Sequence, residues 1–109
     1  MSEYDPHEAI NYIYNNCSNY AKAKGRLAGL ETYKSSLKAI MMKKSSEQSL
    51  GGQEREAYAS QEYQNLCTAI DEATVEAEEW KWKLESAKMR FQAWQTESAN
   101  NRQLEKFTV

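Results

Sequence analysis

An unbroken heptad pattern of apolar residues between residues 63 and 94 constrains the fold of this chain more than any other feature. Its ten members, spaced alternately by three and four residues, are Tyr63, Leu66, Ile70, Ala73, Ala77, Trp80, Leu84, Ala87, Phe91 and Trp94. No Pro or Gly interrupts the chain from Gln53 to Val109. A helix with this period buries one narrow apolar seam against a second helix, as coiled coils do.

The partner helix is expected to begin at Pro6. Asp5 occupies the N-cap position, Pro6 the first helical position and Glu8 the third, which together are typical of a helix start. The positions that we expect on its seam are Ile10, Ile13, Cys17, Tyr20, Ala23, Leu27, Leu30, Lys34, Leu37 and Met41. Their spacing of three and four residues predicts a helix over about residues 6–44.

A polar segment from Ser45 to Gly52, which ends in a Gly pair, separates the two patterns and predicts a turn. The second helix is expected over about residues 53–100, followed by a frayed tail, because the apolar seam ends near Ser98. The sequence therefore predicts an all-α fold of one domain, residues 1–109. It is a long antiparallel helical hairpin with coiled-coil heptad packing.

In such a hairpin the residue numbers of facing positions add up to about 98. Gly25 then faces Ala73, so we expect close backbone approach at Gly25 and Gly29. The basic residues between Tyr20 and Lys44 also face the acidic segment from Glu62 to Glu79. We expect these charges to form ion pairs between the two helices.

The composition fits a thin core and a soluble protein. The mean hydropathy is -0.89, and the net charge of -2 gives no whole-molecule attraction for nucleic acid or for a membrane surface. No uninterrupted apolar run approaches the roughly 20 residues that span a bilayer. Cys17 and Cys67 form no CxxC pair, so we expect reduced, structural thiols and a cytoplasmic location.

Residues suited to catalysis or metal binding are few. His7 is the only histidine, and no cysteine or acid lies near it at the spacing of a metal site. The acids Glu72, Glu76 and Glu79 share a helix face but lack the Glu-x-x-His pairs of di-iron bundles. We therefore expect no catalytic residues, no metal and no cofactor, and predict that the chain is not an enzyme.

A second set of apolar residues lies off the predicted seam. Val75, Trp82 and Met89 are spaced by seven residues on the outer face of the second helix, and Tyr33 and Ile40 flank the seam of the first. A second apolar stripe on an amphipathic helix is typical of burial against something else. Either two hairpins pair into a four-helix bundle, as a homodimer, or the stripe binds a foreign protein with Trp82 as its anchor.

A basic cluster interleaved with aromatic residues offers an alternative. Its members are Lys81, Lys83, Lys88, Arg90 and Arg102. Such residues can hold single-stranded nucleic acid by phosphate contact and base stacking. The aromatic residues Trp80, Phe91 and Trp94, however, lie on the heptad seam, which disfavours stacking.

The segment Lys88-Met-Arg-Phe-Gln-Ala-Trp-Gln-Thr-Glu-Ser-Ala-Asn-Asn-Arg-Gln-Leu-Glu105 resembles the C-terminal end of small helical proteins from the early regions of tailed bacteriophages, near recombination or replication genes. The resemblance implies a phage origin and an accessory role in DNA metabolism or in countering a host system. The leading hypothesis is a non-enzymatic interaction protein that binds a protein of such a pathway. The alternative is a nucleic-acid-binding accessory protein that uses residues 81–102.

Overall fold

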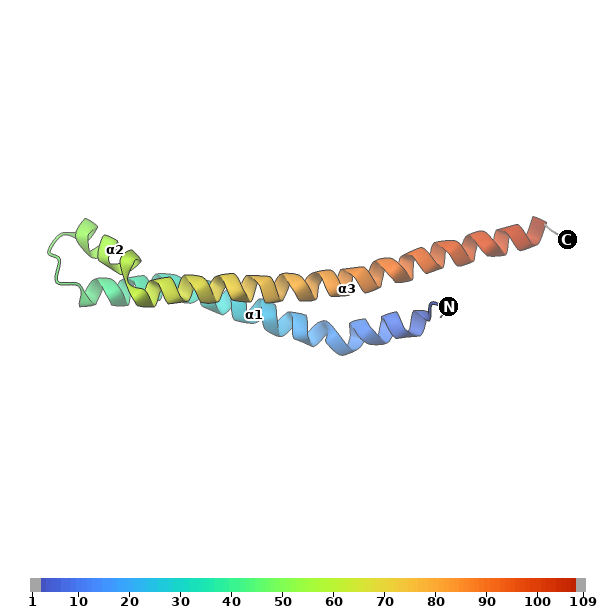
Figure 1. Ribbon diagram of the computed structural model, residues 1–109, viewed down its shortest axis with the longest axis horizontal. Helices are drawn as coiled ribbons and strands as arrows, with labels where there is room; N and C mark the ends of the chain where they lie inside the picture. The colour runs from blue at the N-terminus through green and yellow to red at the C-terminus, as the bar shows by residue number, and fades with distance from the viewer. Residues whose placement is uncertain (1–2, 108–109) are drawn as a thin grey trace. The chain divides into compact units, whose positions relative to one another are not determined.

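The computed structural model describes residues 3–107, and it is all-helical, as predicted (Figure 1). Helix α1 spans Pro6–Lys44, α2 spans Leu50–Ala59 and α3 spans Gln61–Phe107; no strand occurs within residues 3–107. Asp5 caps α1 as expected, because its carboxylate accepts a 2.9 Å hydrogen bond from the His7 backbone N–H. Contacts divide the chain into two compact units, residues 21–78 and residues 1–20 with 79–109, and each is described by itself. The single domain stays a prediction.

In the unit of residues 21–78, α1 and α3 run antiparallel around an apolar core. Leu37, Tyr63 and Leu66 are buried together, and the half-buried side chains that pack against them are Leu30, Met41, Cys67 and Ile70. Arg26 forms a 2.7 Å ion pair with Glu76. The predicted register places Glu72 opposite Arg26, and Glu72 lies one helical turn from Glu76. The hairpin is confirmed, and its register differs from the predicted one by no more than about one turn.

Helix α2 lies against the end of α1 in the same unit. The Lys38 Nζ lies 3.5 Å from a carboxylate oxygen of Glu54 and 4.8 Å from the centre of the Tyr58 ring. The interaction with the Tyr58 side chain, supported by the charge of Glu54, raises the pKa of Lys38 above its ordinary value. Tyr58 in turn contacts Tyr63 edge to face, with 5.2 Å between ring centres. Apolar and charged contacts therefore both hold α2.

The predicted turn is confirmed over residues 45–49 but is shorter than the expected 45–52, and the continuous second helix from residue 53 is wrong. Ser49 caps a helix that begins at Leu50, because its hydroxyl accepts a 3.0 Å hydrogen bond from the Gly52 N–H. That helix ends at Ala59, and the backbone of the following Ser60 is extended at φ -65° and ψ 148°. The Ser60 hydroxyl donates to the Ala57 carbonyl and accepts from the Tyr63 N–H. A serine that bonds both neighbouring helix ends breaks the helix without Pro or Gly.

Two further expectations about the helices are corrected. Helix α3 continues to Phe107, so the tail does not fray after residue 100; residues 108–109 lie outside the described part. Most of this last stretch, from Arg102 to Lys106, consists of good helix formers. Gly25 and Gly29 are exposed, and a Cβ atom added at either would meet nothing within 4 Å. They are not sites of close backbone approach.

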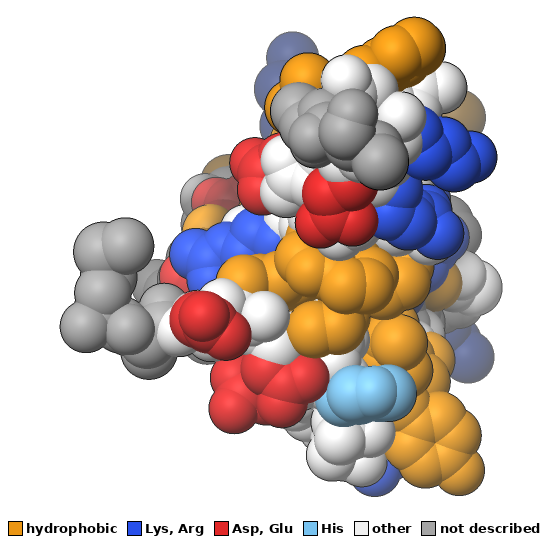
Figure 2. Space-filling model, turned by 90° about the vertical axis from the view of Figure 1, so that its right-hand side faces the viewer, with side chains coloured by type: hydrophobic (Ala, Val, Ile, Leu, Met, Phe, Trp, Pro, Cys, Tyr) orange, Lys and Arg blue, Asp and Glu red, His pale blue; other side chains and the backbone are white. Residues whose placement is uncertain are grey.

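The second unit pairs the start of α1 with the later part of α3. Ala9 and Ala87 are buried, and Tyr4 packs on Trp94 with 6.5 Å between ring centres. Ile10 and Cys17, which were expected on the seam, are exposed. The side of α1 that is buried here instead contains Ala9, Ile13, Asn16 and Tyr20, which are spaced by four, three and four residues and are all buried or half-buried. Figure 2 shows hydrophobic side chains reaching the surface among acidic and basic ones.

Candidate interaction surface

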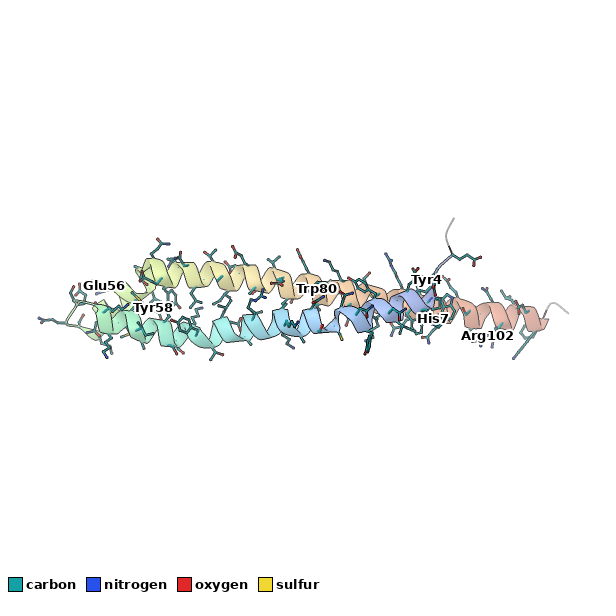
Figure 3. The ribbon with its side chains drawn as sticks, turned by 90° about the horizontal axis from the view of Figure 1, so that it is seen from below. Tyr4, His7, Glu56, Tyr58, Trp80 and Arg102 are labelled. Carbon is teal, nitrogen blue, oxygen red and sulfur yellow. The ribbon has the colours of Figure 1, made fainter. Side chains whose placement is uncertain are left out.

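All ten heptad positions predicted for α3 are buried or half-buried, in both units. Trp80 is half-buried and points toward α1 (Figure 3). Phe91 and Trp94 are half-buried as well, with 5.9 Å between their ring centres. This burial fixes which side of α3 faces α1, whereas the finer heptad packing stays a prediction.

The side of α3 opposite Trp80 carries two large exposed apolar residues. Trp82 is 58% exposed and Met89 is 52% exposed. They are seven residues apart, about two helical turns, so both project from the same face. The prediction that Trp82 points away from the seam is confirmed.

The remaining residues predicted to bind a partner lie in the unit of residues 21–78. Tyr33 and Ile40 are exposed and, seven residues apart, share one face of α1. Val75 is exposed on α3. All three are accessible, but they come from two different helices.

The five predicted nucleic-acid contacts are exposed, but they do not form a single patch. Lys81 precedes Trp82 and Lys83 follows it, so the two lysines lie on opposite sides of the apolar face. Their Nζ atoms lie over aromatic rings, Lys81 at 5.5 Å from the centre of the Trp82 ring and Lys83 at 4.9 Å from that of Trp80. Lys88 lies seven residues after Lys81 and Arg90 seven residues after Lys83, so each lies on the same side of the apolar face as that lysine.

Arg102 lies apart from the other four, near the end of α3 (Figure 3). Together with Trp94, Gln95 and Ser98 it lines a shallow hollow of about 360 Å³. An indole ring and a guanidinium group are therefore brought together on one side of the helix. This is one place in residues 81–102 where a base and a phosphate could be held at once.

Two exposed aromatic residues, Tyr14 and Phe107, were not predicted from the sequence as part of an interaction surface. Tyr14 is 80% exposed and Phe107 is 86% exposed. Phe107 lies about seven helical turns beyond Trp82, so a straight α3 carries it on the same face. The spacing was present in the sequence, but the expected fraying after residue 100 concealed it.

Groups suited to chemistry are sparse among residues 3–107. This part of the chain holds no cluster of three or more His, Cys, Asp or Glu side chains that could bind a metal ion. Cys17 and Cys67 are free thiols, the first exposed and the second half-buried. No helix in the described part is long and apolar enough to cross a membrane.

Comparison with models of known protein families, with curated proteins and with solved structures gives no match.

Proposed function

We propose that the chain is a non-enzymatic interaction protein that binds another protein through the face of α3 formed by Trp82 and Met89. We infer its role from the resemblance of residues 88–105 to small phage proteins: an accessory factor in the bacterial host cytoplasm. It would act on a protein of recombination, replication or host defence.

The exposure of Trp82 carries this proposal. An indole that is 58% exposed on the face opposite the seam contributes little to the hairpin and lowers solubility. Tryptophan is among the residues most enriched at the energetic centres of protein interfaces. Met89 extends the same face and can adapt its shape to a partner.

Affinity capture with matched variants tests the proposal. The wild-type chain, Trp82→Ala and Tyr14→Ala would be immobilised and exposed to bacterial lysate, and bound proteins identified by mass spectrometry. Tyr14→Ala is the control, because it removes an aromatic ring that is 80% exposed on α1. We expect a protein that the wild type and Tyr14→Ala retain and Trp82→Ala loses. Equal capture by all three would contradict the proposal.

Nucleic-acid binding is the second candidate, favoured by the hollow that Trp94 and Arg102 share. Phosphate contacts weaken steeply with salt, whereas apolar contacts do not. Titration of labelled single- and double-stranded oligonucleotides at two salt concentrations separates the candidates. Binding at low salt that Arg102→Gln abolishes would support nucleic acid, and absence of binding at low salt would eliminate it.

A further inference from the structure

We propose that helix α2 is a hinged strap, which swings out about Ser60 and joins α3 in one continuous helix from residue 50 onward. The closed form is the one in the structure, with α2 beside the end of α1 (Figure 1). The extended form is the continuous helix. The strap lies within the unit of residues 21–78, and the proposal goes beyond the proposed function, which depends on Trp82 and Met89.

A change in one backbone angle separates the two forms. Ser60 has a φ of -65°, which is already the value of an α-helix, and only its ψ of 148° lies outside the helical region. Rotation of this ψ to about -42° would align α2 with α3. Residues 53–59 and 61–64 contain no Pro or Gly and are mostly good helix formers. The break therefore depends on Ser60 and on the contacts that α2 makes.

The connection between α1 and α2 is long enough for the extended form. Facing residues of α1 and α3 have numbers that add up to about 102, as in the Arg26–Glu76 ion pair, so Lys44 lies level with about residue 58. In the extended form Leu50 would lie about 12 Å farther along the axis and about 9 Å to the side, or about 15 Å from Lys44. The connecting residues 45–49 can extend over about 20 Å. Helix α1 can therefore stay in place while α2 moves.

The contacts that hold the closed form are concentrated on Lys38 and Tyr58. The Lys38 Nζ lies 3.5 Å from a carboxylate oxygen of Glu54 and 4.8 Å from the centre of the Tyr58 ring. The Tyr58 ring meets that of Tyr63 edge to face at 5.2 Å, although Tyr58 is 43% exposed. The closed form is further held by the burial of Ala57 and by the hydrogen bond between the Ser45 hydroxyl and Glu56.

Backbone hydrogen bonds can be made in both forms. In the closed form the Tyr58 carbonyl accepts a 2.8 Å bond from the Gln64 side chain, and the Tyr63 N–H donates to the Ser60 hydroxyl at 3.2 Å. In a continuous helix the N–H groups of residues 61–63 would instead donate to the carbonyls of residues 57–59. The balance between the forms is therefore set by the side-chain contacts of α2.

Opening the strap changes the surface at this end of the hairpin. Tyr63 is buried with Leu37 and Leu66 in the apolar core, and Tyr58 lies against its ring. In the extended form Tyr58 moves away with α2, so the edge of the Tyr63 ring becomes accessible. The strap thus controls access to the end of the core.

Exchange NMR of the full chain tests the strap, because ¹³C saturation transfer gives the population and the Cα shift of a minor form. Tyr58→Ala removes the ring contacts with Lys38 and Tyr63 and introduces the best helix former. Tyr33→Ala is the matched control, since it removes a tyrosine ring that is 46% exposed from the same unit. Lys38→Met is a second variant, which keeps the aliphatic stem and loses the charge.

We expect Ser60 of the wild type to show a minor form with a helical Cα shift, populated at about 1%. The ratio of this form to the closed form should rise about tenfold in Tyr58→Ala, rise in Lys38→Met and stay unchanged in Tyr33→Ala. Residues 50–59 should keep helical shifts in both forms.

Three results would overturn the proposal. The first is the absence of a minor form with a helical Ser60 in both Tyr58→Ala and Lys38→Met. The second is a minor form in which residues 50–59 lose their helical shifts, because α2 then unfolds instead of swinging out. The third is an equal rise in Tyr33→Ala, because the contacts of α2 would then not hold the closed form.

Discussion

Replacing Leu37 with alanine should destabilise the hairpin by about 3 kcal/mol. Leu37 is only 8% exposed and packs with Tyr63 and Leu66 between α1 and α3. The substitution removes three buried carbon groups, worth about 2.4 kcal/mol at roughly 0.8 kcal/mol each. The remaining cavity adds a smaller cost, because the half-buried Leu30 and Met41 at its edge can move inward.

Urea denaturation followed by far-UV circular dichroism gives the free energy of unfolding. Ile40→Ala is the matched control, since it removes a similar volume from the same helix at a side chain that is 42% exposed. We expect Ile40→Ala to cost less than about 1 kcal/mol. Equal losses of unfolding free energy in the two variants, or a larger loss for Ile40→Ala, would refute the antiparallel packing of α1 on α3 around Leu37.

Three more outcomes follow from single contacts. Ser60→Ala should lower the free energy of unfolding by about 1 kcal/mol in the same urea assay, because it removes the cap of α3; an unchanged value would contradict the capping role. Trp80→Ala should lower the free energy of unfolding by about 2 kcal/mol because the Trp80 side chain is half-buried. Trp82→Ala should change the free energy of unfolding of the monomer by less than about 0.5 kcal/mol. A larger loss for Trp82→Ala than for Trp80→Ala would contradict the faces assigned to the two side chains. The raised pKa of Lys38 means that its contact with Tyr58 stabilises the fold fully below pH 10.5 and is lost as the pH rises through the folded pKa. An NMR titration of Lys38 should show a lower pKa in Tyr58→Phe, and an unchanged pKa would refute the assigned cause.

The helical hairpin was predictable because the heptad of α3 is regular over ten positions. Each of these positions is buried or half-buried, from Tyr63 to Trp94. Alternation of three and four residues keeps one stripe of a helix on one side, so the pattern alone fixes the face that meets α1. The exposure of Trp82 was predictable from the same heptad, because Trp82 lies outside its ten positions.

The break at Ser60 was not predictable from periodicity. Ser60 lacks the backbone restrictions of Pro or Gly, and its effect comes from hydrogen bonds to Ala57 and Tyr63. The seam of α1 near its start was misjudged for a related reason, since hydrophobicity favoured Cys17 over Asn16. The half-buried Asn16 satisfies its amide by donating to the Tyr12 carbonyl at 2.9 Å, so a polar residue is accommodated there.

The candidate surface was predictable only in part. The outer position of Trp82 and Met89 follows from the heptad. The basic residues near Trp82 were grouped by sequence proximity, whereas the helix separates Lys81 and Lys83 to opposite sides. Proximity along a helix is a poor guide to a shared patch.

The accessibility of Trp82 to a quencher tests the central claim most directly. In the variant Trp80→Phe/Trp94→Phe, Trp82 is the only tryptophan that remains, so acrylamide quenching reports its exposure alone. We predict strong quenching in the protein alone, close to that of an exposed indole, and protection when the protein is mixed with its captured partner. Protection in the protein alone would contradict the outward placement of Trp82, and strong quenching under both conditions would contradict its role as a binding face.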